Sequence, residues 1–510
     1  MKAPKRFALF AALALIPALV LAMPASAAQA GGTLKIGCQP TNLLDPHFAA
    51  NITDILVAEQ GYHHLTFIDA QNNAVPDLAT RWETSDGKVW TFFLQPGITF
   101  SNGQPVTAKD VVFSYNRLRD PKVGAPTVKL YENVTAVDAL DDLTVRFTLK
   151  HPNHEFASDV GDYHACVIPE GTRDPGKTRI GSDPYMIASF FPEDRLVMVK
   201  NPHFKADDGA GDPLPHLDEI HFIFSPDIGG QVEALRGGEL DFVGGLTTEF
   251  AEVIEKDLNT KLLTNDSNMH WTIHMRSDKG HLAADPRIRQ AFKLATDHQA
   301  LINAVRPGLA AVGNGFSPVG PAYGAYHLAQ APVPDPAKAK QLLADAGYAE
   351  GLRITLVAQN QLDVIPIATV WKEQLAQVGV TADIQVVPTD VYYSDGESGW
   401  LNCDFGITDW GSRATPVTYF KLAYMSDAPW NGSHWQDAEF DELAHQVDRE
   451  LDPAKRAELY HKLQQILIDR GPVIVPYFEK AVVGVSARLE EVALASDWAR
   501  TRFWRGYFAP

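Results

Sequence analysis

The sequence is short of basic residues and of cysteine, and each shortage excludes a class of protein. Lys and Arg number 44 against 63 Asp and Glu, which gives a net charge of −19. That acidity argues against nucleic acid and anionic membrane as partners. The three cysteines, Cys38, Cys166 and Cys403, form no C-x-x-C pair. An odd count leaves at least one thiol free, and whether the other two form a disulfide stays open.

Long apolar runs are also lacking after the N-terminus, where no segment approaches the roughly 20 apolar residues that a membrane span needs. The first residues are typical of a secretory signal, with a basic start at Lys2, Lys5 and Arg6 and an apolar stretch over 8–23. We expect a signal peptide over 1–27, with cleavage after Ala27, Ala28 or Ala30. The mature charge is then −22, because three basic residues leave a total of −19.

A lipid anchor is not expected. Cys38 follows Lys35-Ile36-Gly37, which is a poor lipobox. We therefore predict a soluble periplasmic protein.

Catalytic motifs are missing as well. The sequence has no H-E-x-x-H, P-loop or helix-opening G-x-G-x-x-G, and the segment from Gly315 to Val319 lacks the second glycine of a nucleophile elbow. We expect no enzyme activity and no cofactor. The alternative is a secreted hydrolase that uses an unrecognised site.

Histidines are present, but their spacing does not predict a metal site. The pairs are His63-His64, His151 with His154, and His270 with His274. Adjacent histidines on a helix point in different directions, and no carboxylate spacing completes a ligand set. We expect surface or packing roles.

The most structured stretch runs over 76–118. Asp86-Gly87 is a hairpin turn signal, and the strand over 88–95 looks buried on both faces. Thr107 with Asp110 resembles a helix cap, and Val111 and Tyr115 then lie on one face of that helix. A helix is also expected over 52–65.

Downstream, helices and strands alternate. Strands are expected over 143–150, 352–358 and 381–387, and helices over 232–238, 336–346, 365–378 and 453–470. That rhythm indicates a largely parallel sheet.

The motifs in these segments are similar to those of one protein family. P-x-L-A-x-x-W, D-G-x-x-W-T-F-x-L and F-x-x-G-x-P-V-T-A-x-D-V-x-F-S follow one another over 76–114, with G-x-x-P-Y and K-N-P-x-F blocks over 181–204 and D-P-R-I-R-Q-A at 285–291. This order resembles the family 5 extracellular solute-binding proteins, the peptide- and nickel-type receptors of bacterial ABC importers.

The resemblance implies an α/β fold of the two-lobed periplasmic-binding-protein type (type II, cluster C-like), with an extra subdomain in lobe I and a two-strand hinge. It places lobe I over 31–75 and 181–274, the extra subdomain over 76–180, lobe II over 275–482, and the C-terminal return to lobe I over 483–510.

The segment over 403–420 carries the first candidate ligand residues. Phe405 to Thr408 is a strand that runs into a loop, where open α/β sheets hold ligands. The resemblance implies that Trp410 faces the cleft. Peptide-binding relatives often carry an aspartate three residues later for the peptide amine, where this chain has Arg413. A guanidinium suits a carboxylate or phosphate instead; alternatively, Arg413 pairs with a nearby acid and holds the loop. Asp409 is a candidate anionic contact.

Two further loops complete the candidate ligand-binding set. The loop over 430–435 supplies Trp430, Asn431 and Trp435. Tryptophans can stack on a ligand or belong to the core, and both interpretations stay open. Asn42 lies in a loop that the resemblance places at the cleft edge.

The sequence therefore predicts a monomeric periplasmic receptor that captures a peptide or another small polar or acidic solute by hinge closure and delivers it to an inner-membrane ABC permease. Within this class, Arg413 favours an opine or sugar derivative as the alternative to a peptide.

Overall fold

A computed structural model describes residues 31–510, except 42, 361–362 and 395. The predicted signal peptide and its cleavage site lie outside the described residues. Within them, every helix is too short or too polar to cross a bilayer.

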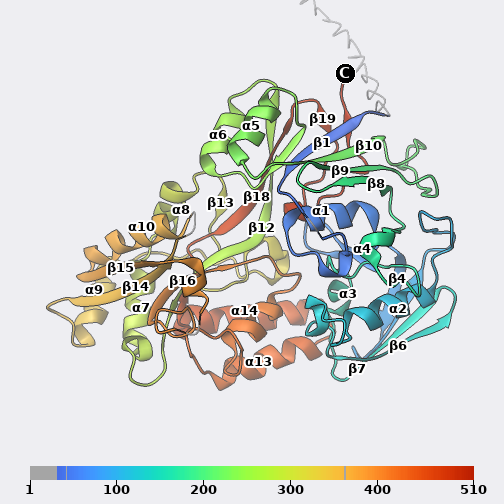
Figure 1. Cartoon of the computed structure of the whole chain (residues 1–510). Coiled ribbons are helices and arrows are strands. Elements are labelled where there is room, and N and C mark those ends of the chain that lie inside the picture. The colour runs from blue at the N-terminus through green and yellow to red at the C-terminus, as the bar shows by residue number, and fades with distance from the viewer. Residues whose placement is uncertain (1–30, 42, 361–362, 395) are drawn as a thin grey trace, which may run out of the picture.

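The largest sheet of the described chain has twelve strands and runs through the whole molecule (Figure 1). Its order is β15 (Val380–Val387), β14 (Leu352–Gln359), β16 (Phe405–Trp410), β12 (Thr260–Met275), β18 (Phe478–Ser486), β11 (Phe242–Gly244), β1 (Thr33–Cys38), β10 (Glu219–Phe224), β9 (Arg195–Lys200) and β8 (Tyr185–Phe191). Two short strands, β13 (Ala310–Ala311) and β17 (Val473–Ile474), pair with β18 and β12.

Orientation in this sheet is mixed. β14 is parallel to β15 and to β16, and β1 is parallel to β10 and β11, as the alternation of helices and strands predicts. β12 and β18 are antiparallel to each other and to the strands beside them. The expectation of a largely parallel sheet is therefore wrong for the centre, where the chain passes twice between two halves.

Those two passages divide the molecule. We call the part before β12 and after β18 the first lobe, and the part between them the second lobe. β12 pairs with β18 from Thr260 to Asp266, shifts register before His270, and then pairs with β16. The two long strands thus cross between lobes as a pair, and Figure 1 shows them near the middle of the molecule, between the two lobes.

The first lobe contains a second sheet of four strands, ordered β4 (Ala79–Thr84), β5 (Val89–Leu94), β7 (Thr144–Leu149) and β6 (Val134–Asp141). The predicted hairpin at Gly87 (φ 67°) is confirmed, as is the helix cap of Thr107 and Asp110. The prediction that both faces of β5 are buried is wrong, because Trp90 lies inside whereas Val89 is 39% exposed on the uncovered face.

Helices cover both lobes. They are α1 (Ile52–Gly61), α2 (Ala108–Leu118), α3 (Phe156–Asp159), α4 (Pro175–Thr178), α5 (Ile228–Arg236) and α6 (Thr248–Glu255) in the first lobe, and α7 (Pro286–Ala295), α8 (His298–Val305), α9 (Pro336–Asp345), α10 (Val364–Gln377), α11 (Thr389–Tyr392), α12 (Pro416–Tyr419), α13 (Ala438–Arg449) and α14 (Pro453–Arg470) in the second. Short elements are the small strands β2 (Thr66–Ile68), β3 (Ala74–Pro76), β19 (Leu489–Glu490) and β20 (Tyr507–Phe508) and the turns η1 (Pro46–Phe48), η2 (Pro126–Val128), η3 (Leu282–Ala284), η4 (Pro321–Tyr326), η5 (Phe420–Tyr424) and η6 (Trp498–Arg500).

Helix α1 is shorter than expected. It ends at Gly61 instead of continuing to Leu65, and Tyr62 is already extended. The amide of His64 donates to the Asp77 carboxylate (2.8 Å) rather than to a carbonyl of the preceding turn. A buried carboxylate outside the helix thus accepts from an amide that a longer helix would have used.

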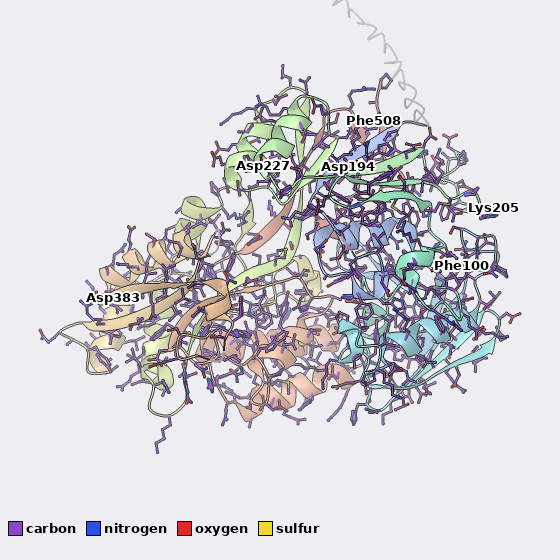
Figure 2. The ribbon with its side chains drawn as sticks, viewed as in Figure 1. Phe100, Asp194, Lys205, Asp227, Asp383 and Phe508 are labelled. Carbon is purple, nitrogen blue, oxygen red and sulfur yellow. The ribbon has the colours of Figure 1, made fainter. Side chains whose placement is uncertain are left out.

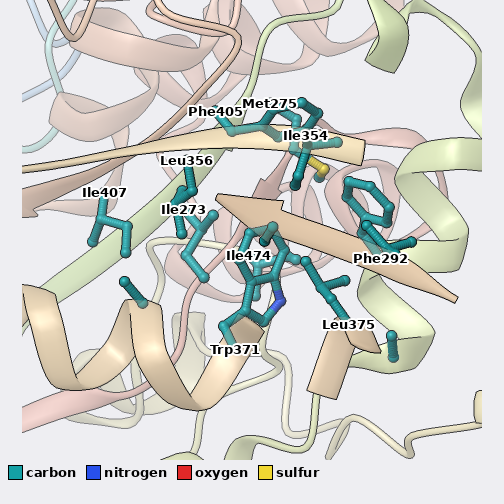
Figure 3. Packing of buried hydrophobic residues seen from close by; sticks show 14 of the residues in the cluster. Ile273, Met275, Phe292, Ile354, Leu356, Trp371, Leu375, Phe405, Ile407 and Ile474 are labelled. Atoms are coloured by element: carbon teal, nitrogen blue, oxygen red, sulfur yellow. The ribbon is translucent and has the colours of Figure 1, made fainter. Parts of the chain in front are cut away.

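The core of the second lobe surrounds Trp371, which is fully buried between the sheet and α10 (Figure 3). Ile273, Leu356 and Ile407 come from three neighbouring strands of the sheet and pack in the same cluster. Such a core fixes the positions at which β14 and β16 end. Cys38, Cys166 and Cys403 are all buried free thiols, which settles the open disulfide question.

Candidate functional site

The candidate site lies where strands β14 and β16 end against the crossing strand β12. Strand β16 runs antiparallel to β12, and its last residue, Trp410, lies opposite His270, next to the register shift where β12 enters the second lobe. Strand β14 runs parallel to β16, so its carboxyl end faces the same way. The crevice outside the carboxyl ends of parallel strands is the usual place for a ligand in an open α/β sheet.

The loop after β16 is tied to the crossing strand by two tyrosines. The hydroxyl of Tyr419 lies 3.1 Å from the carbonyl of Asn268 and 2.9 Å from that of Gly411. The hydroxyl of Tyr323 donates to the carbonyl of Arg413 (2.7 Å). The start of this loop is therefore linked to the crossing strand through Tyr419, and the backbone of Arg413 is held by Tyr323 of η4.

The guanidinium of Arg413 is less firmly held than its backbone. Its Nη1 donates to the carbonyls of Ser412 (3.1 Å) and Gly411 (3.4 Å). Among the described residues, no carboxylate lies within ion-pair distance of it. The sequence left open a structural pairing with a nearby acid, and the described acids do not supply one.

Arg413 acts on groups of both lobes. Burial and the Arg413 charge together lower the pKa of His270 on β12 to about 4, against the opposing hydrogen bond to the carbonyl of Asn268. In the first lobe, burial raises the pKa of Tyr163 to about 12, while the Arg413 charge lowers it. The Arg413 charge is thus felt by a group on the crossing strand and by a group of the first lobe.

Asn268 is a candidate that the sequence analysis missed. It lies where β12 shifts register, and its side chain is fully buried. Neither its amide nitrogen nor its amide oxygen has a hydrogen-bond partner among the described residues. Buried polar atoms normally have partners, so this amide is a second polar group available beside the Arg413 loop.

Asp409 points to the opposite face of β16 from Trp410, because side chains alternate along a strand. Its carboxylate is exposed and accepts hydrogen bonds from the hydroxyl of Tyr393 and from Nε2 of Gln359 (3.0 Å).

Trp410 is 6% exposed and belongs to a buried cluster of the second lobe. Its ring lies 5.9 Å from those of Tyr419 and Trp430. Trp430 is 41% exposed, and its ring centre lies 6.3 Å from that of Trp400. Of the candidate tryptophans, Trp430 therefore offers the most open ring.

The other two residues of this loop contact their own lobe. Trp435 is 6% exposed and its ring packs 5.4 Å from that of Phe440. Asn431 donates to the carbonyls of Trp435 (2.9 Å) and Met425 (3.3 Å). Asn42 lies outside the described residues.

His63 has neighbours that the sequence could not place. Asp77 and Asp183, distant in sequence, lie with it in a buried group that has metal-ligand composition. Arg502 lies among them, 2.9 Å from both oxygens of Asp77 and 3.6 Å from Asp183. The guanidinium therefore already supplies the positive charge beside both carboxylates.

Comparisons with known proteins point to one family. The sequence model described as bacterial extracellular solute-binding proteins, family 5 middle, matches residues 73–432. The chain is 28% identical over 474 residues to the glutathione-binding protein GsiB of Escherichia coli K12, covering 88% of each. HbpA2 from Haemophilus parasuis superposes with a TM-score of 0.81 at 23% identity over 94% of this chain and 100% of that chain. DppA from Helicobacter pylori, in complex with the peptide STSA, gives 0.73 at 22% identity over 94% and 99%.

Proposed function

The chain belongs to the bacterial extracellular solute-binding proteins of family 5, and from that premise we propose that it captures a small carboxylate-bearing solute between its two lobes. It is the solute-binding component of an ABC importer, as members of this family are. The proposed solute is a short peptide or glutathione. The names of two relatives support this class, since GsiB is called glutathione-binding and DppA was solved with a bound peptide.

The observation that carries the proposal is the state of Arg413. A partly buried guanidinium that donates to two carbonyls and to no other described residue retains donors for a bidentate bond to a carboxylate. Its backbone is fixed by Tyr323, so little order has to be gained on binding. We propose Arg413 as the carboxylate anchor, with Asn268, Asp409, Trp410 and Trp430 as further contacts.

The proposed mechanism is closure about β12 and β18. Contacts away from these strands already join the lobes, and two of them are hydrogen bonds of Tyr460 and Asn72. The Tyr460 hydroxyl of α14 lies 3.1 Å from both carboxylate oxygens of Glu155, and the Asn72 amide donates to the carbonyl of Ala322 (3.2 Å). A ligand that contacts both lobes would shift the population toward this closed form, which the permease would then recognise.

Three further parts of the proposal follow from the sequence. The chain acts in the periplasm after removal of residues 1–27, as a monomer and without a lipid anchor. It binds without turnover, rather than acting as a hydrolase. Its lobe I comprises 31–75, 181–274 and 483–510, with the extra subdomain at 76–180 and lobe II at 275–482.

Calorimetric titration of the Arg413→Ala variant tests the anchor. The probes are reduced glutathione, trialanine and trialanine C-terminal amide, with octopine and maltotriose as the opine and sugar alternatives. Loss of one partner of a desolvated charge pair costs about 2–5 kcal/mol, so the affinity for carboxylate probes should fall at least about thirty-fold.

The control is Arg353→Ala, because Arg353 pairs with Asp383 on the outer edge of the second lobe, where Figure 2 labels Asp383. It should leave binding unchanged. Unchanged affinity in Arg413→Ala, or equal binding of trialanine and its amide by the native protein, would reject the carboxylate anchor. Release of a product would reject a pure binding role.

A further inference from the structure

The short segment η4 (Pro321–Tyr326) has one tyrosine near each end, and the first of them contacts the Arg413 loop. Tyr323 is 8% exposed, and its hydroxyl donates to the carbonyl of Arg413 (2.7 Å). Its ring lies 6.4 Å from that of Tyr419, whose hydroxyl donates to the carbonyl of Asn268 on the crossing strand. This end of η4 therefore holds the loop that carries the proposed carboxylate anchor.

The second tyrosine of η4 lies at the contact between the lobes. The hydroxyl of Tyr326 accepts hydrogen bonds from Nε (3.1 Å) and Nη2 (3.0 Å) of Arg456 on α14, whose Nη1 donates to the carbonyl of Glu450. Nε of Arg456 lies 3.7 Å from the carboxylate of Glu155 in the first lobe. The same carboxylate accepts from the hydroxyl of Tyr460, whose ring packs 4.7 Å from that of Tyr326. This end of η4 therefore orients the groups of the second lobe that meet the first.

Between the two tyrosines the segment bends at Gly324. This residue has φ 57° and ψ −119°, a conformation that favours glycine. Among the described residues, apart from its neighbours in the chain, no atom lies within 4 Å of the position that a Cβ would take there. Helix α14 holds the bent segment, because Nε2 of Gln464 donates to the carbonyl of Tyr326 (2.7 Å) and Nε2 of His461 lies 3.0 Å from that of Ala325. The bend thus fixes the positions of the two tyrosines relative to each other.

The first lobe also contacts η4 directly. The side-chain amide of Asn72 donates to the carbonyl of Ala322 (3.2 Å), the residue before Tyr323. The first lobe thus reaches this segment at Asn72 and, through Arg456, at Glu155. Lobe closure and the ligand loop therefore both act on the position of one short segment, which is the physical requirement for coupling between them.

We infer that Tyr323 and Tyr326 are positioning residues, through which η4 couples carboxylate binding at Arg413 to the contact between the lobes. This inference rests on the proposed function and assigns a route by which ligand binding favours closure. A carboxylate that fixes the Arg413 loop also fixes Tyr323. The bent segment then holds Tyr326 where Arg456 reaches the first lobe. The coupling is reciprocal, because each of two linked equilibria changes the other by the same factor.

Tyr326→Phe tests the route from the lobe contact to the ligand, because phenylalanine keeps the ring and removes only the hydroxyl. The probes are trialanine and trialanine C-terminal amide in calorimetric titration. A change in closure alone would weaken both probes by the same factor. Coupling through η4 should instead lower the preference for trialanine over its amide about threefold, the effect of one hydrogen bond. An unchanged preference overturns the inference.

Tyr323→Phe tests the opposite direction in the unliganded protein. Removal of this hydroxyl releases the Arg413 loop and, through η4, loosens the contact at Glu155. Scattering should therefore show a larger radius of gyration than that of the native protein. The double variant Tyr323→Phe with Glu155→Gln should expand no further than Glu155→Gln alone. An unchanged radius in Tyr323→Phe, or a full further expansion in the double variant, overturns the inference without any bound ligand.

Gly324→Ala should produce both effects together, because alanine strains the bend without meeting a neighbouring side chain. Gly347→Ala is the matched control, since Gly347 follows α9, has φ 99° and has equally open surroundings. Tyr185→Phe is the control for the tyrosine variants, because its hydroxyl donates to the carbonyl of Leu217 (3.1 Å) in the first lobe. Both controls should keep the native preference and the native radius. A control that loses both would overturn the inference, because the effects would then not depend on η4.

The two proposals fail in different ways. A native protein that binds trialanine and its amide equally overturns the Arg413 anchor, and the coupling with it. A native preference for trialanine that Tyr326→Phe retains in full overturns the coupling and leaves the anchor standing. A lower urea midpoint in Tyr326→Phe with equal weakening of both probes also overturns the coupling alone, because it assigns the hydroxyl to folding.

Discussion

Two guanidinium groups of this protein have opposite surroundings. Arg502 of the first lobe is buried, and both oxygens of Asp77 accept from it at 2.9 Å. Glu59 lies 3.3 Å away, and the rings of Phe67 and Trp504 lie 4.1 Å and 4.8 Å from its guanidinium carbon. Arg413 of the second lobe has, among the described residues, only the carbonyls of Ser412 and Gly411 as partners of its guanidinium.

The difference separates a charge that belongs to the fold from one available to a ligand. Arg502 has its donors and both faces of its guanidinium covered by its own chain, so its removal takes away the positive charge beside the buried carboxylates of Asp77 and Asp183. Arg413 keeps donors unused while its backbone is fixed. The residue type alone therefore does not indicate the role of an arginine, whereas the number of carboxylates that surround its guanidinium does.

The largest expected effect is on Arg502. Arg502→Met should lower the free energy of unfolding by about 3–5 kcal/mol, because breaking a buried ion pair leaves uncompensated charge. Urea unfolding followed by tryptophan fluorescence measures this. Arg81→Met is the control, since Arg81 pairs with Glu83 at the surface and should cost little. A loss below about 1 kcal/mol in Arg502→Met would remove the contrast with Arg413.

The next effect separates charge from geometry at Arg413. Arg413→Lys keeps the positive charge but loses the planar fork, so trialanine and glutathione should bind roughly tenfold more weakly, or about 1.5 kcal/mol. The variant should still bind better than Arg413→Ala, and its melting curve should match the native one. If lysine and alanine weaken binding equally, a point charge contributes nothing and the contact depends wholly on the fork.

A third arginine lies between these extremes and gives a smaller effect. Arg456 of α14 reaches across to Glu155 of the first lobe (3.7 Å) and also donates to Tyr326 (3.1 Å). Glu155→Gln should weaken this contact between the lobes and lower ligand affinity by roughly fivefold, about 1 kcal/mol, since the closed form becomes less populated.

Scattering of unliganded Glu155→Gln should show a larger radius of gyration than the native protein, with the urea midpoint nearly unchanged. An unchanged radius together with a lower urea midpoint would assign Glu155 to folding, beside Arg502.

Much of the fold is predictable from the sequence because its signals are local. The cap of α2, the turn at Gly87 and the helix that begins at Pro453 all depend on residues a few positions apart. The family assignment also came from contiguous motifs. The orientation of β12 and β18 was missed, because the pairing of strands that far apart leaves no local pattern.

The site was less predictable for the same reason. Arg413 was singled out only by comparison with the family pattern. That no described carboxylate pairs with it could be seen only from the structure. The position of the Asn268 side chain depends on the register shift in β12, and no residue in the sequence predicts that shift. Gln359 could have been found, since it is the last residue of β14 and ligands bind at such carboxyl ends.

The smallest expected effect is a titration that reports the Arg413 charge from inside the protein. Burial, and to a lesser extent the Arg413 charge, lower the pKa of His270 to about 4, while the hydrogen bond to the carbonyl of Asn268 opposes this. Removing the guanidinium should therefore raise the His270 pKa toward its ordinary value of 6.5. A carboxylate ligand that neutralises Arg413 should do the same in the native protein and change nothing in Arg413→Ala. Ring resonances of His270 followed by NMR against pH measure all four states.

The sign of the linked stability follows from that lowered pKa. Between about 6.5 and about 4 the unfolded chain binds a proton at this residue that the folded protein refuses, so the free energy of unfolding falls as the pH falls. The fall should be smaller in Arg413→Ala, because its folded and unfolded pKa values lie closer together. Arg502→Met, whose guanidinium is not among the groups that shift His270, should leave this pKa in place. An equal shift of the His270 pKa in both variants would mean that this pKa responds to a general change in the structure. The claim that the Arg413 charge acts on His270 would then be wrong.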